Sequence, residues 1–498
     1  MNSATVVSSP GKVLIAGGYL VLDRAYAGVV VSTSSRFYTV VQNSSSKENL
    51  ITVRSPQFVS ATWAYSVKFE PSVLVEDLPT NESKNKFVHL ALQSIISLAC
   101  EIKGVAHVKT QLSSGIKIHI VGDNDFYSQR AQLASLSLPR TLASLSKIPP
   151  FVPTGVPISQ VHKTGLGSSA ALITSLTSSL LLHLSIIPPS DLVQNDSEGR
   201  HLAHNLSQYV HCLAQGKVGS GFDVSAAVFG SHIYTRFDPA VIQQLMSDST
   251  SNPQPLLPTV SPSNTAWNYK VSNFQLPPLT RMMLADVDAG SDTPSLVGKV
   301  LRWRKEDPLT GMSGALWSSL GVINQLLAQT LLKLTDLHSK DPAVYEDCLK
   351  FLSITKASEW LSTPRDSAVG NTIVSTFDEV RRISEAIREK MREMGTLSDV
   401  PIEPSEQTQL LDLCISQPGV IGGGVPGAGG YDALWLLVCD PTADISPNQR
   451  PVEIVENVWN IYKELDVSPL SAVESLAKGA RVEDLDSIPG LRNAIAST

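Results

Sequence analysis

A glycine-rich stretch at residues 163–171, Lys-Thr-Gly-Leu-Gly-Ser-Ser-Ala-Ala, constrains the fold of this chain more than any other feature. Its glycines allow close approach of the backbone to a ligand, and the apolar run that follows predicts a helix from Ser168 to about Leu184. Ser168 or Ser169 can cap that helix, whose free N–H groups would then bind an anion. The stretch is no Walker A loop. A tight turn into a capped helix, with no ligand, is the alternative interpretation.

Two further glycine-rich segments adjoin apolar strands. Residues 9–19, Ser-Pro-Gly-Lys-Val-Leu-Ile-Ala-Gly-Gly-Tyr, place Lys12 between a Pro-Gly turn and a strand. Residues 426–432, Pro-Gly-Ala-Gly-Gly-Tyr-Asp, precede the core strand 433–438. Glycine before a strand indicates backbone packed against another element or a ligand, and a lysine at a strand end can also simply extend along the surface. Three such segments together favour a ligand site over three independent turns.

A chain of 498 residues is too long for one core, so we expect two domains, at 1–245 and 265–498. A stretch rich in Ser, Asn and Pro at 248–264 is the expected linker. Periodicity predicts strands at 13–15, 29–32, 37–41, 51–54, 65–69, 116–121 and 282–286, and a strand pair within 419–438. It predicts further helices at 86–100, 200–215, 310–334, 343–361 and 377–394.

Charge and cysteine content restrict the partners. Asp and Glu number 46 against 39 Lys and Arg, a net charge of −7, which excludes a general attraction to nucleic acid or anionic lipid. Apolar runs such as 433–439 are too short to span a membrane. The five cysteines are odd in number and widely spaced, as in reduced cytosolic proteins. With neither a secretory leader nor a peroxisomal address in the sequence, we expect a cytoplasmic location.

The three segments, in this order, resemble those of the GHMP kinases. Residues 10–23 look like PGKxxxxGGYxVLD, 163–170 like KTGLGSSA, and 426–433 like PGAGGYDA. These forms are similar to the eukaryotic, fungal-type phosphomevalonate kinases, as are residues 83–85, 125–129, 215–224, 290–293, 402–404 and 407–408. The resemblance, which runs from residue 9 to about 435, implies a two-domain α+β fold. It implies an N-terminal domain like domain 2 of ribosomal protein S5, a ferredoxin-like C-terminal domain, and a cleft between them.

The resemblance also implies the reaction and its residues. ATP and (R)-5-phosphomevalonate would give ADP and 5-diphosphomevalonate, in the mevalonate pathway to isoprenoids and sterols such as ergosterol. Lys12 and Asp223 would be catalytic. The implied ATP site comprises Lys84, Asn85, Lys163, Thr164, Gly165, Leu166, Gly167, Ser168, Ser169 and Ala170. The implied acceptor site comprises Tyr19, Lys217, Ser220, Gly221, Ser291, Thr293, Gly427, Ala428 and Gly429.

The implied Mg²⁺ site departs from that of mevalonate kinases, which carry a glutamate about three helical turns before the aspartate. Residues 199–222 contain no acidic residue, and Cys212 stands at the corresponding position. Mg²⁺ would therefore rest on nucleotide phosphates, water and the hydroxyl of Ser168 or Ser169. His201, His204 and His211 lie on one predicted helix, but no acidic ligand accompanies them, so we expect core or surface histidines.

Two alternatives stay open at this point. One is another member of the superfamily, a mevalonate kinase or a diphosphomevalonate decarboxylase. The other is a nucleotide-binding regulator that has lost catalysis. For Asp223 itself, the alternative interpretation is a turn cap after glycine. The missing glutamate and the Gly-Tyr-Asp form of the third segment argue against a mevalonate kinase, and the presence of both Lys12 and Asp223 argues against a regulator. The expected partners are small molecules, with the chain a monomer or homodimer.

Overall fold

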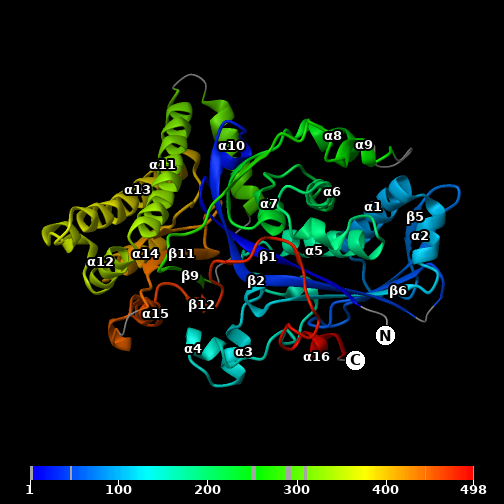
Figure 1. The fold of residues 1–498 in the computed structure, drawn as a ribbon, viewed down its shortest axis with the longest axis horizontal. Helices are drawn as coiled ribbons and strands as arrows, with labels where there is room; N and C mark the ends of the chain where they lie inside the picture. The colour runs from blue at the N-terminus through cyan, green and yellow to red at the C-terminus, as the bar shows by residue number, and fades with distance from the viewer. Residues whose placement is uncertain are drawn as a thin grey trace.

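Two β-sheets with helices packed against them make up the molecule (Figure 1). The computed structural model describes residues 4–44, 47–247, 254–287, 293–307, 311–442 and 445–496. Within those residues the larger sheet has nine strands and the smaller has four. The larger sheet runs in the order β13 (Arg481–Val482), β1 (Thr5–Ala16), β2 (Ala27–Asn43), β6 (Ile116–Gly122), β3 (Leu50–Arg54), β4 (Thr62–Lys68) and β5 (Leu74–Asp77). In addition, β7 (His232–Thr235) pairs with β2 and with β8 (Lys270–Asn273).

The central strand β2 is longer than the sequence predicted. The predicted strands 29–32 and 37–41 are parts of one strand of 17 residues. The polar residues between them remain in the strand because a segment from the far end of the chain supplies partners. The Ser34 N–H donates to the Val473 carbonyl at 2.7 Å, and the Ser475 N–H donates to the Ser32 carbonyl at 2.8 Å. Periodicity within 27–43 could not reveal this distant partner.

One face of the larger sheet is covered by helices. The predicted apolar helix is α5 (Ser168–His183), which packs on β1 and β2 and has α1 (Lys86–Lys103) and α6 (Glu198–Gln215) beside it. The short helix α7 (Phe222–Phe229) also contacts β1. Most side chains of α5, including several serines and threonines, are buried, because the helix lies between the sheet and the outer helices. Smaller helices lie on the same side: α2 (Val105–Gln111), α8 (Ala240–Ser247) and α9 (Leu257–Val260). The short helices α3 (Arg130–Ser135) and α4 (Leu142–Leu145) lie on the opposite side of the sheet in Figure 1, and α4 contacts β12 (Ser468–Leu470) of the smaller sheet.

The smaller sheet is antiparallel, in the order β10 (Val420–Gly424), β11 (Ala433–Cys439), β9 (Thr280–Asp286) and β12 (Ser468–Leu470). Helices follow β9 and separate β11 from β12, which is the β-α-β-β-α-β order of a ferredoxin-like unit. The α+β class and the ferredoxin-like second part are therefore confirmed. Its helices are α10 (Thr293–Glu306), α11 (Met312–Lys340), α12 (Pro342–Ile354), α13 (Ala368–Ser398), α14 (Ser405–Ile415) and α15 (Pro451–Ile461).

One predicted helix ends early. The prediction at 343–361 corresponds to α12 followed by a separate 3₁₀ turn, Ala357–Ser362. Thr355 between them is extended, and its carbonyl accepts from the Trp360 indole N–H at 3.0 Å and from the Gly419 N–H at 3.3 Å. These tertiary partners replace the helical hydrogen bond of the Thr355 carbonyl, so the helix ends there. The predicted helix was too long because the apolar spacing in the sequence continues beyond this point.

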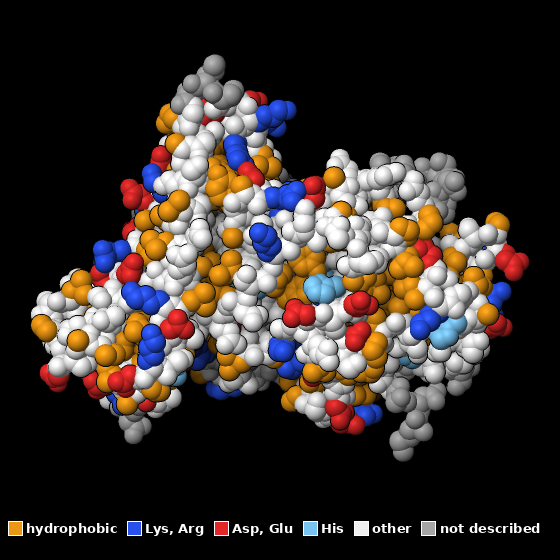
Figure 2. All heavy atoms as spheres, turned by 45° about the horizontal axis from the view of Figure 1, so that its top comes forward, with side chains coloured by type: hydrophobic (Ala, Val, Ile, Leu, Met, Phe, Trp, Pro, Cys, Tyr) orange, Lys and Arg blue, Asp and Glu red, His pale blue; other side chains and the backbone are white. Residues whose placement is uncertain are grey.

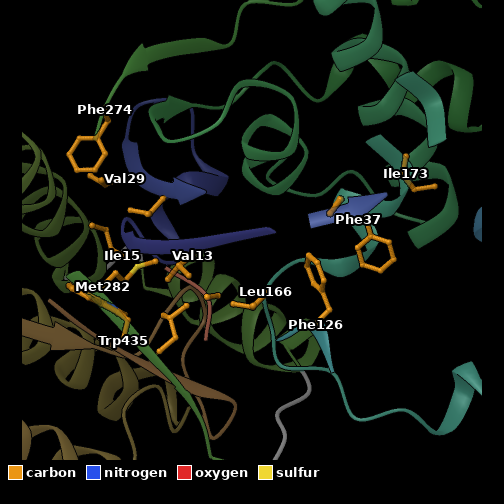
Figure 3. Packing of buried hydrophobic residues seen from close by; sticks show 14 of the residues in the cluster. Val13, Ile15, Val29, Phe37, Phe126, Leu166, Ile173, Phe274, Met282 and Trp435 are labelled. Carbon is orange, nitrogen blue, oxygen red and sulfur yellow. The ribbon is translucent and has the colours of Figure 1, made fainter. Parts of the chain in front are cut away.

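The two sheets share one hydrophobic core. Figure 3 shows Val13 and Ile15 of β1 close to Met282 of β9 and Trp435 of β11, with Leu166 of the glycine-rich stretch at the same level. All five side chains are buried. The glycine-rich segments are therefore held between two packed sheets. On the face in Figure 2, acidic and basic side chains are interspersed, in keeping with the low net charge. None of the helices in the described part of the chain is long and apolar enough to cross a membrane.

Residues 471–496 return to the larger sheet and end in α16 (Leu491–Ala496), so that the chain's two ends lie on the same side in Figure 1. Asp125 accepts from the N–H and the hydroxyl of Ser471 at 2.8 and 2.7 Å, and the Arg36 guanidinium donates to the Gly479 carbonyl at 2.5 Å. Sheet membership thus differs from the expected division, because β8 and β13 belong to the larger sheet although both lie within 265–498. The division into 1–245 and 265–498 as folding units stays a prediction, and part of its linker, 248–253, lies outside the described residues.

Candidate active site

The glycine-rich stretch forms a loop that enters α5. Gly165 and Gly167 have φ of 77° and 79°, a conformation that favours glycine. Gly167 is the N-cap of α5, and no side chain caps the helix. The expectation that Ser168 or Ser169 caps it is wrong, since both lie inside the first turn. The uncapped first turn leaves backbone N–H groups for an anion.

Lys12 ties β1 to this loop. Its backbone N–H donates to the Leu166 carbonyl at 2.9 Å, and its ammonium donates to the Gly165 carbonyl at 2.8 Å. A Cβ at Gly167 would lie 2.9 Å from Cε of Lys12, so the glycine leaves room for the lysine. Burial lowers the pKa of Lys12, while the negative charges of Asp223 and Asp432 oppose that shift. The lysine is thus poised between the loop and two carboxylates.

Asp223 lies in the first turn of α7 and is 22% exposed, toward the cleft. Its Oδ1 accepts from the Val224 N–H at 2.9 Å. Gly221, the N-cap of α7 with φ of 84°, fits closely, since a Cβ there would lie 2.7 Å from the Gln208 amide nitrogen. That amide donates to the Gly221 carbonyl at 2.6 Å, and the Tyr234 hydroxyl donates to the Ser220 carbonyl at 3.0 Å. The backbone that carries Asp223 is therefore fixed on both sides.

His211 joins the loop to Asp223, a role that the sequence reasoning missed. It is buried on α6, with Nε2 at 3.0 Å from the Ser169 hydroxyl and 3.8 Å from Oδ2 of Asp223. The expectation of core or surface histidines allowed for a buried His211 but did not include its contact with Ser169. The available signal was its place beside Cys212, where the mevalonate kinases carry their glutamate. His204 lies among aromatic rings, and His201 contacts the Tyr269 hydroxyl at 2.6 Å.

The third glycine segment closes the opposite wall. The Tyr19 hydroxyl donates to the Ala428 carbonyl at 2.7 Å, and the Gly427 N–H donates to the Leu14 carbonyl at 3.2 Å. A Cβ at Gly18 would lie 2.1 Å from the Gly427 carbonyl oxygen. Glycine is thus required because the first and third segments pack backbone against backbone.

The three segments surround one cleft of about 590 Å³. The predicted site residues that line it are Lys12, Tyr19, Thr164, Gly165, Leu166, Gly167, Lys217, Ser220, Gly221, Asp223, Gly427, Ala428 and Gly429. His211 and Asp432, which the prediction did not include, line it as well. Glycine backbone, two lysines and two carboxylates therefore meet around a space large enough for small phosphorylated molecules.

An apolar hollow of about 90 Å³ lies on the other side of the loop. Asn85, Lys163, Ser168 and Ser169 line it together with aromatic rings such as Trp63. Asn85 also caps α1, its side-chain oxygen accepting from the Val88 N–H at 3.2 Å. Burial lowers the pKa of Lys163. This arrangement places apolar surface next to an anion-binding loop.

Two predicted site residues with described side chains, Ala170 and Lys84, line neither space. Ala170 is buried against Val224 and Val228 of α7, and Lys84 is exposed before α1. Ser291 lies outside the described residues, and of Thr293 only its place as the first residue of α10 is described. The described residues contain no group of three or more His, Cys, Asp or Glu side chains placed to hold a metal ion.

Comparison with known proteins shows that the chain is similar to several kinases that bear the same name. No family model matches the chain. It is 37% identical over 460 residues to a peroxisomal phosphomevalonate kinase of Arabidopsis thaliana, covering 87% of this chain and 90% of the relative. It is 35% identical over 496 residues to a phosphomevalonate kinase of Gibberella zeae, covering 97% and 98%. A solved phosphomevalonate kinase of Streptococcus pneumoniae, in complex with phosphomevalonate and AMPPNP, shares the fold with a TM-score of 0.56 at 14% identity, covering 94% and 99%.

Proposed function

The chain belongs to the phosphomevalonate kinases, within the GHMP kinases, and from that premise we propose which of its residues carry out the reaction. It is an ATP-dependent phosphotransferase that passes the γ-phosphoryl group to (R)-5-phosphomevalonate. The products are 5-diphosphomevalonate and ADP, in the mevalonate pathway. The observation that supports the residue assignment is the convergence of Lys12, Asp223 and the first turn of α5 on one cleft.

Phosphoryl transfer depends mainly on alignment and on charge neutralisation. The N–H groups at the start of α5 hold phosphate oxygens of ATP. Lys12 supplies positive charge where negative charge develops. The acceptor phosphate has a second pKa of about 6 and is mostly dianionic at pH 7. Asp223 therefore orients Lys12 and the acceptor instead of removing a proton.

The Mg²⁺ that accompanies ATP would be held through serine hydroxyls and water. Mg²⁺, when bound, offsets the charge of the nucleotide phosphates. Ser168 and Ser169, partly buried in the first turn of α5, would hold it. The Ser169 hydroxyl is oriented by His211, with Nε2 at 3.0 Å. The lack of a carboxylate cluster in the described residues suits an ion that retains several waters.

The acceptor side carries the cations that a second anion requires. Lys217 lies at the cleft on the segment between α6 and α7, and Gly427 and Ala428 offer backbone groups opposite it. We assign Tyr19, Lys217, Ser220, Gly221 and Gly427 to Gly429 to the acceptor. Ser291 and Thr293 stay proposals from the resemblance.

A coupled ADP-release assay tests the assignment of substrate. Purified protein is supplied with ATP, Mg²⁺ and, in separate reactions, phosphomevalonate, mevalonate, galactose or homoserine. We expect turnover with phosphomevalonate alone, because the cleft carries cations for a second phosphate. Turnover with unphosphorylated mevalonate that equals or exceeds it would contradict the assignment.

We also propose a cytoplasmic location and a monomeric or homodimeric state. All five cysteines are free and four of them are buried, which suits a reducing compartment. Imaging a fluorescent fusion against a peroxisomal marker tests the location, since the Arabidopsis relative is named peroxisomal. Light scattering gives the mass in solution.

A further inference from the structure

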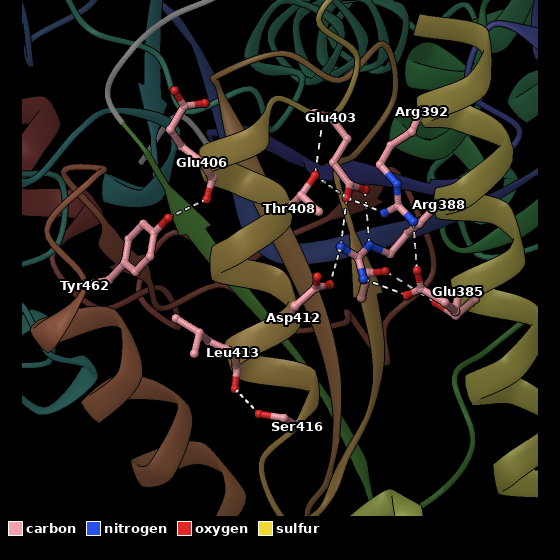
Figure 4. Close-up of polar contacts among 12 residues, drawn as sticks. Glu385, Arg388, Arg392, Glu403, Glu406, Thr408, Asp412, Leu413, Ser416 and Tyr462 are labelled. Carbon is pink, nitrogen blue, oxygen red and sulfur yellow. Dashed lines mark hydrogen bonds and ion pairs between the residues drawn. The ribbon is translucent and has the colours of Figure 1, made fainter. Parts of the chain in front are cut away.

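A buried ion cluster lies behind the third glycine segment, outside the cleft. Glu403, whose side chain is fully buried, accepts from Nε and Nη2 of Arg388 at 3.2 and 2.8 Å. It also accepts from Nη1 of Arg392 at 2.8 Å and from the Thr408 hydroxyl at 3.0 Å. Figure 4 shows the two arginines reaching from α13 to Glu403 on the segment before α14. Four hydrogen bonds on one carboxylate fix its position closely.

The arginines have further partners on their outer side. Arg388 donates to Glu385 at 2.6 Å and lies 2.9 Å from Asp412, and Arg392 donates to Glu385 at 2.9 Å. Arg388 is only 3% exposed, so its charge must be balanced inside the protein. The cluster is therefore a rigid joint between α13 and the segment 399–408.

That segment holds the wall of the cleft. The Ile402 carbonyl, next to Glu403, accepts from the Gly430 N–H at 2.8 Å, and the Gln407 amide donates to the Gly430 carbonyl at 2.7 Å. A Cβ at Gly429 would lie 2.0 Å from the same Ile402 oxygen. The backbone at Gly429 and Gly430 is thus pressed against the segment that Glu403 anchors.

The same helix also supports the first glycine segment. Met391, between the two arginines on α13, packs so that a Cβ at Gly18 would lie 3.0 Å from its Cε. Gly18 in turn contacts Gly427, and Tyr19 binds the Ala428 carbonyl. One stretch of α13, residues 388–392, therefore sets the relative position of both segments that form this wall.

We propose that Glu403, clamped by Arg388 and Arg392, is a positioning residue for the acceptor: it places the backbone of residues 427–430 in the cleft without touching substrate. This inference rests on the proposed function, in which that backbone binds phosphomevalonate. A shift of about 1 Å in a binding group can cost on the order of 100-fold in rate. Releasing the clamp should therefore weaken acceptor binding while the ATP side, on α5, keeps its geometry.

The test compares Glu403→Gln with Asp378→Asn. Asp378 is a matched control, because it is a buried carboxylate on α13 that binds two arginines, Arg381 and Arg382, away from the glycine segments. We expect Glu403→Gln to raise the KM for phosphomevalonate about tenfold or more and the KM for ATP by less than about twofold. Asp378→Asn should change neither by more than about twofold. Equal effects of the two variants on the acceptor KM would overturn the proposal.

Hydrogen exchange gives a readout that needs no substrate. We expect the peptide covering residues 427–432 to exchange about tenfold faster in Glu403→Gln than in the wild type, with no change in Asp378→Asn. Unchanged exchange of this peptide in Glu403→Gln would overturn the positioning role. A wild type that is inactive on phosphomevalonate would contradict the proposed function, but it would leave the exchange test of Glu403 valid. Should Glu403→Gln fail to fold, Thr408→Val, which removes one of the four hydrogen bonds, must show the same pattern at smaller size.

Discussion

At the scale of single residues, burial and neighbouring carboxylates act in opposite directions on the charge of Lys12 in the cleft. Burial lowers the pKa of Lys12, and Asp223 and Asp432 resist that change. Asp223 keeps Lys12 charged and aligned, so its contribution to catalysis should disappear when Lys12 is replaced. The two residues should therefore behave as one unit in mutagenesis.

A double-mutant cycle tests this pairing. We expect Asp223→Asn and Lys12→Met each to lower kcat by about 100-fold or more, because either change leaves a charge without its partner. The double mutant should lose far less than the product of the two. The native pH–rate profile should rise with the acceptor's second ionisation at about pH 6. Losses in kcat that multiply would show that the residues act independently.

His211 invites a second comparison within one helix. His211→Ala removes the contact to the Ser169 hydroxyl, and we expect weaker binding of the Mg²⁺–nucleotide complex, by about tenfold, in equilibrium titrations with AMPPNP. His201→Ala is the control, since His201 binds Tyr269 and does not line the cleft. Equal nucleotide affinity in the two variants would leave His211 with a packing role only.

At the scale of elements, the loop before α5 offers a pair of glycines that separates strain from crowding. Both have positive φ, but a Cβ at Gly165 meets nothing within 4 Å, whereas one at Gly167 lies 2.9 Å from Lys12. Gly165→Ala should cost about 1 kcal/mol of stability from backbone strain alone. Gly167→Ala should cost a similar amount and in addition lower kcat about tenfold or more, by displacing Lys12. Thermal melts and kcat together decide, and equal kcat in the two folded variants would contradict the crowding argument.

Some elements could be predicted from the sequence and others could not, for physical reasons. Local periodicity was sufficient for α1, α5, α6 and the β10–β11 pair, whose apolar residues face a core within reach of their own pattern. The glycine segments indicated the cleft because glycine is the residue required wherever two backbone segments approach closely. The N-cap of α5 was misassigned because Gly167, in a left-handed conformation, begins the helix in place of a serine. The clamp on Glu403 was invisible, since its partners lie 11 and 15 residues away on another element.

At the scale of the whole molecule, the returning segment 471–496 holds the larger sheet together. Glu474 accepts from the Ser231 hydroxyl at 3.0 Å and from the Leu276 N–H at 3.1 Å, and it is partly buried. Burial raises the pKa of Glu474 to about 7. Because the folded state then binds the proton more tightly than the unfolded state, this group favours folding below its unfolded pKa. That contribution is lost as pH rises through about 7.

This linkage between protonation and folding predicts that replacing Glu474 by a neutral residue increases stability at high pH but not at low pH. Glu474→Gln should raise the Tm at pH 8 by several degrees and have little effect at pH 5, where the native carboxyl is already protonated. Glu464→Gln, at an exposed glutamate, should change the Tm at neither pH. A Glu474→Gln variant that is less stable at pH 8 would show that the ionised carboxylate is the form that the fold prefers.

The pairing of β13 with β1 has a consequence for biosynthesis. On the ribosome, β1 emerges well before β13: the residues that pair with its free edge at Val7 and Ser8 lie more than 400 positions later along the chain. Until then the strand that carries Lys12 presents unpaired backbone groups, the kind of edge that recruits other chains. One edge of β1 is therefore paired early by β2, while the other stays open at Val7 and Ser8 until residues 481 and 482 have been synthesised.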